Sequence, residues 1–572
     1  MLENYPKWVQ HLAQKYVTKT IFMFTLHSNI HDLQPIKEGE GYRYLPLKDF
    51  LRDELFKRRD IVVFYDRASG ISFRTPEMKQ DFQRALSAYD TLYGTNFAIS
   101  PPKDPVRAFA VLENYFKVRL QDGKRIAMII DYAETLIPMA EAAHYNVEDR
   151  TVLTFLHKWS HDHTFMGADI TFILLAENLS DLNQQFRKNP YTAEIEIPFP
   201  DETQRLAYIA YEFAKFPNYA DFFKISPAVL AKHTAGMNLI NLKTLIAEVK
   251  ENKIIFDYET LKEKKKEIIE AEAGGLLEFV YSKYSLADVA GHKYAKKHLL
   301  ETAKAIKQGR HDVVPMGYLV CGPVGTGKTF LVSCFANDIG VPMVMLKNFR
   351  SQWQGVTEGN LEKVLKILKA MTPVAVMIDE ADAYLGDRNN EGDSGVSNRV
   401  FSMIASFMSN TEHRGKIIWF LMTARPDLMP VDFKRQGRAE EHIALFYPQT
   451  VEEKKELFAV MLKKTGIKNL TVDQIPESVL TDNKVFSGAD IEAALTRAKF
   501  RAVSEGTGEV TPEIIQKTFD DFLPPTYPEE VELMNYVAVL ECTSKDLLPE
   551  KYRNLTRAEV ISKIKELKMY IE

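Results

Sequence analysis

The sequence predicts an α/β protein with two parallel sheets flanked by helices, each sheet followed by a small helical domain. Between Pro315 and Glu380 a strand, a glycine-rich loop, a helix and a second apolar strand ending in acid follow one another, which is the order of a parallel α/β sheet. Residues 20–250 repeat much of this order. At 572 residues the chain is too long for one hydrophobic core, so roughly three or four compact units are expected.

The composition is that of an ordinary globular protein. Apolar residues make up 45% and charged residues 26%, which excludes a disordered or fibrous chain. The net charge of −5 gives no reason to expect a nucleic-acid partner. Cys321, Cys334 and Cys542 suggest neither disulfides nor a zinc site, and no apolar run reaches the roughly 18 residues of a membrane span. We therefore expect a cytoplasmic protein without a membrane span.

The strongest local pattern is Gly-Pro-Val-Gly-Thr-Gly-Lys-Thr at 322–329, between the apolar strand 317–321 and a helix. Its glycines let backbone N–H groups approach phosphate oxygens without an intervening side chain. Lys328 is expected to reach the β and γ phosphates, and Thr329, which opens the helix, to ligate Mg²⁺. This Walker A pattern predicts a site for ATP and Mg²⁺ that consists of Gly322, Pro323, Val324, Gly325, Thr326, Gly327, Lys328, Thr329 and Phe330.

A Walker B pattern follows at 374–380, where five apolar residues precede Asp379 and Glu380. The apolar run fits a fully buried strand, and two carboxylates at its end would be costly there without a function. Asp379 is expected to hold the Mg²⁺ shell, and Glu380 to polarise the attacking water. The two patterns together predict an enzyme that hydrolyses ATP to ADP and phosphate.

Residues 285–524 resemble the AAA+ ATPase cassette of membrane-anchored ATP-dependent proteases, proteasomal ATPases and related unfoldases. Ser285–Gly291 is similar to the segment that opens such cassettes, so the resemblance places Asp288 and Gly291 near the adenine. The segment 486–491 is similar to the start of a helix in the small lid over the nucleotide, which implies that Gly488 and Ala489 contribute to the site. The expected fold is a P-loop AAA+ sheet with a helical lid.

The resemblance also implies assembly. Phe433-Lys-Arg435-Gln-Gly-Arg438 matches the family segment with two arginine fingers, which a neighbouring subunit supplies to complete charge stabilisation at the γ-phosphoryl. A head-to-tail contact that closes on itself gives a ring, and the family resemblance implies a homohexamer. The alternative is that Arg435 and Arg438 are ordinary surface arginines.

The chain departs from the family pattern after the acidic strand. The family usually has Ala-Thr-Asn before Arg-Pro-Asp, whereas this chain reads Met422-Thr423-Ala424 before Arg425-Pro-Asp. Ala424 therefore replaces the water-positioning Asn. A small register shift would let the Thr423 hydroxyl, which both donates and accepts, take over this role. Otherwise hydrolysis is slow or tuned by a partner.

The segment 351–361 aligns with the pore loop of unfoldases, and this resemblance gives Trp353, Gln354 and Gly355 contact with a threaded protein substrate. An aromatic suits that task because it offers a large, sequence-tolerant apolar contact. The alternative is that Trp353 packs on the domain surface or in an interface. A second exposed loop is expected over 386–398. The chain has no His-Glu-x-x-His pattern, so the zinc protease module of some relatives is missing.

The first half resembles a degenerate AAA+ fold. Ile126–Asp131 is an apolar strand ending in acid, but Tyr132 replaces the catalytic glutamate, and Asn178 and Arg187 follow at the positions of the later motifs. Residues 21–29 lie where a phosphate loop belongs, yet contain neither glycine nor lysine. We expect a scaffold, ring stabiliser or substrate receptor. The alternative is an unrelated α/β domain whose strand ends in Asp by accident.

The order of these features divides the chain into six segments. In the C-terminal segment a helix is expected over 557–569, and its apolar face is expected to dock on the lid or on a neighbouring subunit. The expected segments are a degenerate AAA+-like α/β domain (1–200), its helical lid (201–260), a charged linker (261–284), the ATPase domain (285–447), its lid (448–524) and a C-terminal helical extension (525–572).

The leading functional hypothesis is an ATP-driven ring that remodels, unfolds or disassembles a protein substrate of unknown identity. A nucleotide-gated scaffold with slow turnover is a second hypothesis, because of Ala424 and the inactive first half. A nucleic-acid motor is a third, disfavoured by the acidic balance and the aromatic pore loop.

Overall fold

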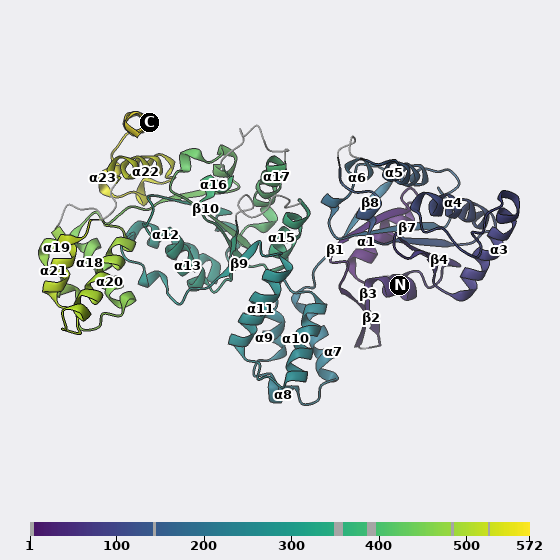
Figure 1. Cartoon of the computed structure of the whole chain (residues 1–572), viewed down its shortest axis with the longest axis horizontal. Coiled ribbons are helices and arrows are strands. Elements are labelled where there is room, and N and C mark those ends of the chain that lie inside the picture. Colours follow the sequence, from purple (N-terminus) through teal and green to yellow (C-terminus); the bar gives the residue numbers. More distant parts are fainter. Residues whose placement is uncertain are drawn as a thin grey trace. The chain divides into compact units, whose positions relative to one another are not determined.

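The structure, a computed structural model, describes residues 5–39, 41–140, 145–347, 358–385, 396–481, 486–523 and 527–571. The chain folds into two compact units, whose elements are labelled in Figure 1. Unit 1 contains Met1–Ala273 and Gly355–Met371, and unit 2 contains Gly274–Gln354 and Thr372–Glu572. Within the described part of the chain, no helix is both long and apolar enough to cross a membrane.

Unit 1 is built on a six-stranded sheet with the order β5-β4-β6-β7-β1-β8. Neighbouring strands are parallel except for the edge strand β5, which is antiparallel to β4. Strands β1, β6 and β7 are buried throughout, as expected for apolar runs that helices cover on both faces. The strands are β1 Met23–Ser28, β4 Ile61–Asp66, β5 Gly70–Phe73, β6 Ile126–Ile130, β7 Ile170–Ala176 and β8 Thr192–Ile197, with a separate antiparallel pair β2 Leu33–Glu38 and β3 Gly41–Pro46.

Helices cover both faces of this sheet. Met23 and Phe24 belong to different hydrophobic cores, because successive strand residues point to opposite faces. Helices α3, α4 and α5 supply the core around Trp159, and α1 and α2 supply the other. The helices of this α/β domain are α1 Lys7–Val17, α2 Leu47–Phe50, α3 Pro76–Tyr93, α4 Pro105–Gln121, α5 Val147–Ser160 and α6 Gln184–Arg187.

A helical domain completes unit 1. It begins where the sequence indicates, because Asp201 and Gln204 form a reciprocal capping box at the start of its first helix, which satisfies backbone donors that the helix leaves open. The helices are α7 Glu202–Ala214, α8 Tyr219–Phe222, α9 Pro227–His233, α10 Leu239–Asn252 and α11 Tyr258–Glu272, and α15 Glu358–Ala370 also belongs to unit 1.

The Lys/Glu run of the expected charged linker (261–284) forms a helix, as its pattern indicates, but the segment is built into the two units rather than linking them. Its first part is helix α11, in which Leu261, Lys265 and Ile269 are buried. Its last part contains strand β9, Leu277–Val280, which joins the sheet of unit 2. Apart from the buried Lys265, the charged residues of the Lys/Glu run lie on the more exposed faces of an amphipathic helix, and this helix belongs to unit 1.

Unit 2 contains a second six-stranded sheet with the order β14-β10-β13-β12-β11-β9. All neighbours are parallel except β9, which is antiparallel to β11. The strands are β9 Leu277–Val280, β10 Gly317–Cys321, β11 Met343–Leu346, β12 Val374–Ile378, β13 Ile417–Thr423 and β14 Glu441–Ala444. The α/β domain also contains the helices α12 Lys293–Lys307, α13 Lys328–Ile339, α16 Ala381–Leu385 and α17 Val396–Met408.

Five strands of each sheet share the same topology, and the sixth, antiparallel strand enters at different points of the chain. Unit 1 read as β8-β1-β7-β6-β4 matches unit 2 read as β14-β10-β13-β12-β11, and an antiparallel strand follows at the same edge in both. Strand β1 is thus the counterpart of β10, which precedes the glycine loop, and β6 is the counterpart of β12, which precedes the acidic pair. The expected similarity between the halves is present in their strand order.

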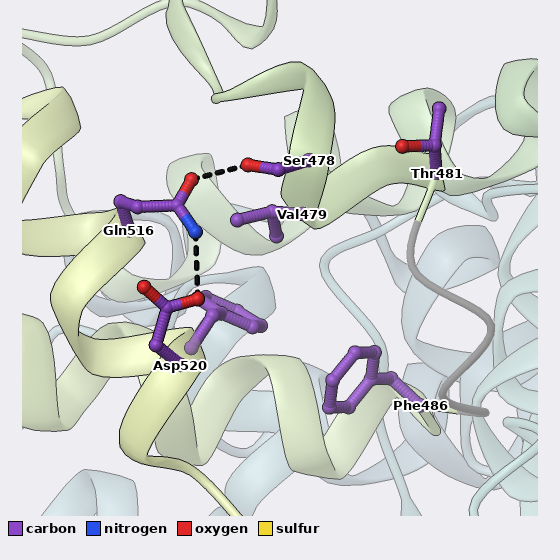
Figure 2. A pocket seen from close by; sticks show the side chains of 7 residues that line it. Ser478, Val479, Thr481, Phe486, Gln516 and Asp520 are labelled. Atoms are coloured by element: carbon purple, nitrogen blue, oxygen red, sulfur yellow. Dashed lines mark hydrogen bonds between the residues drawn. The ribbon is translucent and has the colours of Figure 1, made fainter.

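The lid of unit 2 is a four-helix domain with its own hydrophobic core. Its helices are α18 Val451–Thr465, α19 Glu477–Thr481, α20 Gly488–Ser504 and α21 Pro512–Asp521. A hollow between α19 and α21 is shown in Figure 2, where Ser478 donates to Gln516, and Gln516 Nε2 donates to Asp520 Oδ1 at 2.7 Å. These polar side chains are thus paired with one another.

The C-terminal extension comprises α22 Pro528–Glu541, α23 Glu550–Arg553 and α24 Arg557–Ile571. It packs on the α/β domain of unit 2, where Leu533, Val537 and Ile564 share a core with Cys321 and Ala444. We expected the apolar face of the C-terminal helix to dock on the lid or on a neighbouring subunit. In the structure it packs on the α/β domain of the same chain instead. The expected apolar face is also narrower, because Met569 is 83% exposed.

Candidate ATPase site

The glycine loop follows β10 and requires glycine for steric reasons. Gly322, Gly325 and Gly327 have φ values of 141°, 83° and 83°, a region that side chains disfavour. A Cβ on Gly322 would lie 2.1 Å from the carbonyl oxygen of Leu445, and one on Gly325 would lie 2.8 Å from Cβ of Ser487. The loop therefore lies directly against the end of the sheet and the start of the lid helix α20.

Lys328 and Thr329 open helix α13, as expected. Lys328 Nζ donates to the carbonyl oxygens of Gly322 and Pro323 at 2.8 and 3.0 Å, so the ammonium lies over the loop. Burial lowers the pKa of Lys328, which the nearby carboxylate of Asp379 partly offsets. An ammonium held over a loop of backbone N–H groups is the arrangement that grips phosphate.

The proposed Mg²⁺ ligands lie together. Thr329 Oγ1 donates to Asp379 Oδ2 at 3.0 Å, so the two side chains come from α13 and from the end of β12 to one point. A hydroxyl and a carboxylate are the hard oxygen donors that Mg²⁺ prefers. The residues present therefore fit a magnesium ion.

Glu380 is held in an unusual backbone conformation. Its φ is 47° and its N–H donates to Asp379 Oδ1 at 2.9 Å. A non-glycine residue with positive φ is uncommon and costs free energy, and such residues concentrate at functional sites. Tyr132 at the end of β6 has the same geometry, with φ of 52° and its N–H donating to Asp131 at 3.0 Å. Unit 1 thus keeps the backbone of this site without the catalytic side chain.

The Thr423 hydroxyl has two protein partners in the structure. Its hydroxyl donates to Asp382 Oδ1 at 2.6 Å and accepts from the Arg425 N–H at 2.8 Å. Because a hydroxyl has one proton to donate, Thr423 has no second donor for a water molecule. Its side chain is also buried, with 1% exposure. The Thr423 hydroxyl therefore holds the loop after β13, and its expected role in positioning water stays a prediction.

The two candidate arginine fingers differ in their surroundings. Arg435 has a side chain that is 64% exposed and lies 3.1 Å from Asp432. Arg438 is less exposed, at 20%, and donates to the Asp432 carbonyl oxygen at 2.5 Å. The Arg435 side chain is thus largely accessible to solvent, whereas the Arg438 side chain is held against its own segment.

A cavity of about 310 Å³ adjoins the glycine loop. Of the predicted residues, Gly291, Gly325, Thr326, Gly327, Phe330, Gly488 and Ala489 line it. Asp288 is instead bound to Ser285 and to Lys463 of α18, at 3.2 Å from the lysine. Hydrogen bonds from these two residues lower the pKa of Asp288, so Asp288 links the opening segment to the lid.

Sequence reasoning missed two residues that fix the loop. Tyr447 Oη donates to the Val324 carbonyl oxygen at 2.6 Å, and His292 Nε2 lies 2.9 Å from the Thr326 carbonyl oxygen. Both line the cavity. Their positions in the chain carry no phosphate-binding pattern, so only the fold reveals them.

The pore residues Trp353, Gln354 and Gly355 and most of the loop 386–398 lie outside the described residues. Their roles stay predictions.

At the matching place in unit 1, β1 is followed by the β2–β3 hairpin rather than by a phosphate loop. Arg187, at the position of a finger, is paired with Glu194 at 3.0 Å. Lys48 lies 2.9 Å from Asp131 Oδ2, so the carboxylate at the position of the Mg²⁺ ligand has a protein partner.

Helix α15 binds the same edge of the unit 1 sheet. Glu362 accepts hydrogen bonds from the N–H groups of Leu179 and Ser180 at 3.2 and 2.9 Å. Lys363 lies 2.7 Å from Glu177, which follows β7. Helix α15 therefore contacts the carboxyl end of the unit 1 sheet, which corresponds to the end of the unit 2 sheet that carries the candidate ATP site.

The fold and the site define a P-loop ATPase with a parallel sheet and a helical lid. Residues 318–447 match the family model "ATPase family associated with various cellular activities (AAA)". Residues 2–198 match "AAA+ chaperone, N-terminal Rossmann-like domain", and 203–274 match "AAA+ chaperone, second helical domain". The chain therefore belongs to the AAA+ ATPases, and the first half is the AAA+-type domain that we expected rather than an unrelated one.

Curated relatives are distant and cover the chain in part. The cell division cycle protein 48 homolog of Archaeoglobus fulgidus is 25% identical over 81% of this chain and 65% of its own length. The uncharacterized AAA domain-containing protein ycf46 of Gracilaria tenuistipitata var. liui is 30% identical over 45% and 52%. The ATP-dependent zinc metalloprotease FtsH 1 of Salinibacter ruber is 26% identical over 50% and 40%. The chain thus spans between 40 and 65% of the length of these three proteins.

Proposed function

We propose that the chain hydrolyses ATP within a homohexameric ring and uses this energy to remodel a protein substrate. The observation that carries the proposal is the meeting of Thr329 with Asp379 beside the strained Glu380. Together with Lys328 it supplies phosphate binding, magnesium binding and a base.

The residues divide the reaction among them. Lys328 and the loop N–H groups hold the phosphates, and Thr329 and Asp379 would hold Mg²⁺, which neutralises charge on the phosphate oxygens. The Glu380 carboxylate orients water and accepts its proton. Arg435 of a neighbouring subunit stabilises charge at the γ-phosphoryl, a role that its exposed guanidinium leaves open.

A protein substrate is supported by the kind of relatives found. Two family models that match unit 1 are described as chaperone domains, and one relative is named an ATP-dependent metalloprotease. The aromatic Trp353 suits an extended polypeptide. The acidic net charge disfavours a nucleic-acid substrate.

A second function, a nucleotide-gated scaffold with slow turnover, is favoured by one observation. Ala424 provides no amide for water, and the neighbouring Thr423 hydroxyl already donates to Asp382. Under this proposal ATP binding sets the conformation of the ring, and hydrolysis only resets it.

The test compares ATP turnover of the purified full chain with that of Glu380→Gln. We expect the variant to bind ATP and to lose about 10²-fold or more in kcat, because its base is gone. The matched control is Glu412→Gln, since Glu412 is exposed and should leave turnover unchanged. Stimulation of the wild type by an unfolded protein supports remodelling. Stimulation by DNA alone would contradict it, and equally low turnover of wild type and Glu380→Gln would favour the scaffold.

A further inference from the structure

The C-terminal extension reaches the nucleotide cavity. Leu547, in the short helix η11 (Lys545–Leu547), and Pro549 both line the cavity. Leu547 is 7% exposed and shares a hydrophobic core with Val289 and Leu299. In Figure 1 the extension is the yellow C-terminal part of unit 2, with helices α22 and α23 labelled. Its short helix η11 contacts α12. Part of the cavity wall therefore comes from residues beyond the lid.

Two further residues of the extension contact aromatic side chains that line the cavity. The Tyr552 ring stacks on Phe446, with ring centroids 4.9 Å apart. The Arg553 guanidinium lies 5.0 Å from the centroid of Tyr294. Phe446 and Tyr294 both line the cavity, and stacked rings and cation–π pairs of this kind are attractive. The extension thus fixes two aromatic side chains of the cavity.

The extension also holds the loop after β13. Lys568 Nζ of α24 lies 3.0 Å from Asp427 Oδ2. Asp427 in turn accepts two hydrogen bonds from Arg425, each of 2.9 Å, and the Arg425 N–H binds Thr423. This chain of contacts joins α24 to the loop at which the family pattern places its water-positioning residue.

The segment of the candidate finger has a similar connection. Lys434 Nζ, next to Arg435, lies 2.6 Å from Glu541 Oε1 at the end of α22. Both side chains are largely shielded, with exposures of 11% and 19%, so solvent screens this ion pair less than an exposed one. Helix α22 therefore holds the segment from which Arg435 projects.

From these contacts we infer that the C-terminal extension is a working part of the ATPase site. Leu547 and Pro549 bind the base of the nucleotide, and Lys568 and Glu541 are positioning residues for the loop after β13 and the Arg435 segment. The chemistry fits, since the glycine loop takes the phosphates whereas an apolar wall suits a planar base. This inference rests on the proposed function for its ligand, ATP.

The wall is tested with Leu547→Ala in the full chain, by titrating fluorescent ADP and inorganic pyrophosphate. We expect about five- to tenfold weaker ADP binding, which corresponds to about 1 kcal/mol, and unchanged pyrophosphate binding, because pyrophosphate contacts only the loop. The control is Leu523→Ala, since Leu523 is 81% exposed. Equal losses for both ligands, or no loss, would overturn the role of Leu547. If Leu547→Ala does not fold, Pro549→Ala, which changes the other wall residue at a half-buried position, is read in the same way.

The positioning role is tested with Lys568→Met. We expect kcat to fall about three- to tenfold with ADP affinity unchanged, and Lys568→Arg to restore kcat. Lys565→Met, at an exposed position of the same helix, is the control. Unchanged kcat in Lys568→Met would overturn this role. A wild-type protein that neither binds nor hydrolyses ATP would refute the proposed function. If the wild type is active and Leu547→Ala and Lys568→Met have the same ADP affinity and kcat, only this inference is refuted.

Discussion

At the scale of single residues, the glycine loop depends on neighbours that are far away in sequence. Leu445, Ser487 and Tyr447 each lie more than a hundred residues from the loop, and each contacts it or closes the space around it. The loop pattern itself was predictable, because its glycines and Lys328 follow directly from phosphate chemistry. Its neighbours were not, because their positions depend on the fold of the sheet and the lid.

The first prediction concerns Gly322. In Gly322→Ala the new Cβ would meet the Leu445 carbonyl oxygen at 2.1 Å, and the loop must move at a cost of about 1–3 kcal/mol. We expect about ten- to hundredfold weaker ATP binding, measured by calorimetric titration. Gly340→Ala is the control, because Gly340 also has a positive φ but an added Cβ has nothing within 4 Å. Equal affinity in Gly322→Ala and Gly340→Ala would contradict the close approach.

At the scale of elements, α11 shows how composition misleads. The Lys/Glu run suggested a solvated helix, yet one face of the helix is buried, because Leu261, Lys265 and Ile269 repeat every four residues. A spacing of four places side chains on one face of a helix, so the signal was present in the sequence. Burial lowers the pKa of Lys265 to about 8, since the charged form loses hydration there.

The second prediction concerns Glu362 of α15. Burial alone would raise the pKa of this carboxyl, but Lys366 and the Ser180 N–H outweigh burial and lower it. A carboxyl with a lowered folded pKa stabilises the fold above its unfolded pKa of about 4.3, and this effect is lost as pH falls through the folded pKa. Glu362→Gln should therefore weaken unit 1 at pH 7, by about 1–3 kcal/mol, and less at acidic pH.

The measurement is hydrogen exchange of the amides of Leu179 and Ser180, which bind Glu362. Each rate is corrected for the intrinsic effect of pH. Glu259→Gln serves as the control, because the side chain of Glu259 is 75% exposed. If protection of these amides were the same in wild type and Glu362→Gln at pH 7, the contacts would carry no stability.

At the scale of the whole molecule, the shared strand order explains what could be foreseen. The acidic strand end at Asp131 and the apolar run of β7 indicated an AAA+-like first half, and the order of the sheet and the family match confirm it. The β2–β3 hairpin and the place of α15 in unit 1 were not foreseeable, because they depend on pairings between segments that carry no motif.

The third prediction tests shared sites between subunits. Arg435→Ala and Glu380→Gln are each expected to be nearly inactive, because an arginine finger and a base each contribute several orders of magnitude. Arg435→Ala subunits keep Glu380, and Glu380→Gln subunits keep Arg435. If an equal mixture assembles at random, about a quarter of the interfaces join an intact Glu380 to an intact Arg435 of the neighbour. Mixing should therefore restore ATPase activity.

Arg310→Ala is the matched control, because Arg310 lies in the same domain and its ion pair with Asp312, at 2.9 Å, is exposed to solvent on both sides. It should keep full activity alone. A mixture of the two inactive variants that stays inactive, although both assemble, would mean that Arg435 does not act across subunits.

The β2–β3 hairpin has a consequence for stoichiometry. Because the hairpin follows β1 where unit 2 has its glycine loop, titration of the full chain with ATP should saturate at one equivalent rather than two. A point substitution cannot change this number, since the backbone path itself lacks the turn that exposes successive N–H groups to phosphate. The two units thus have related sheets, but only unit 2 is expected to bind and hydrolyse ATP.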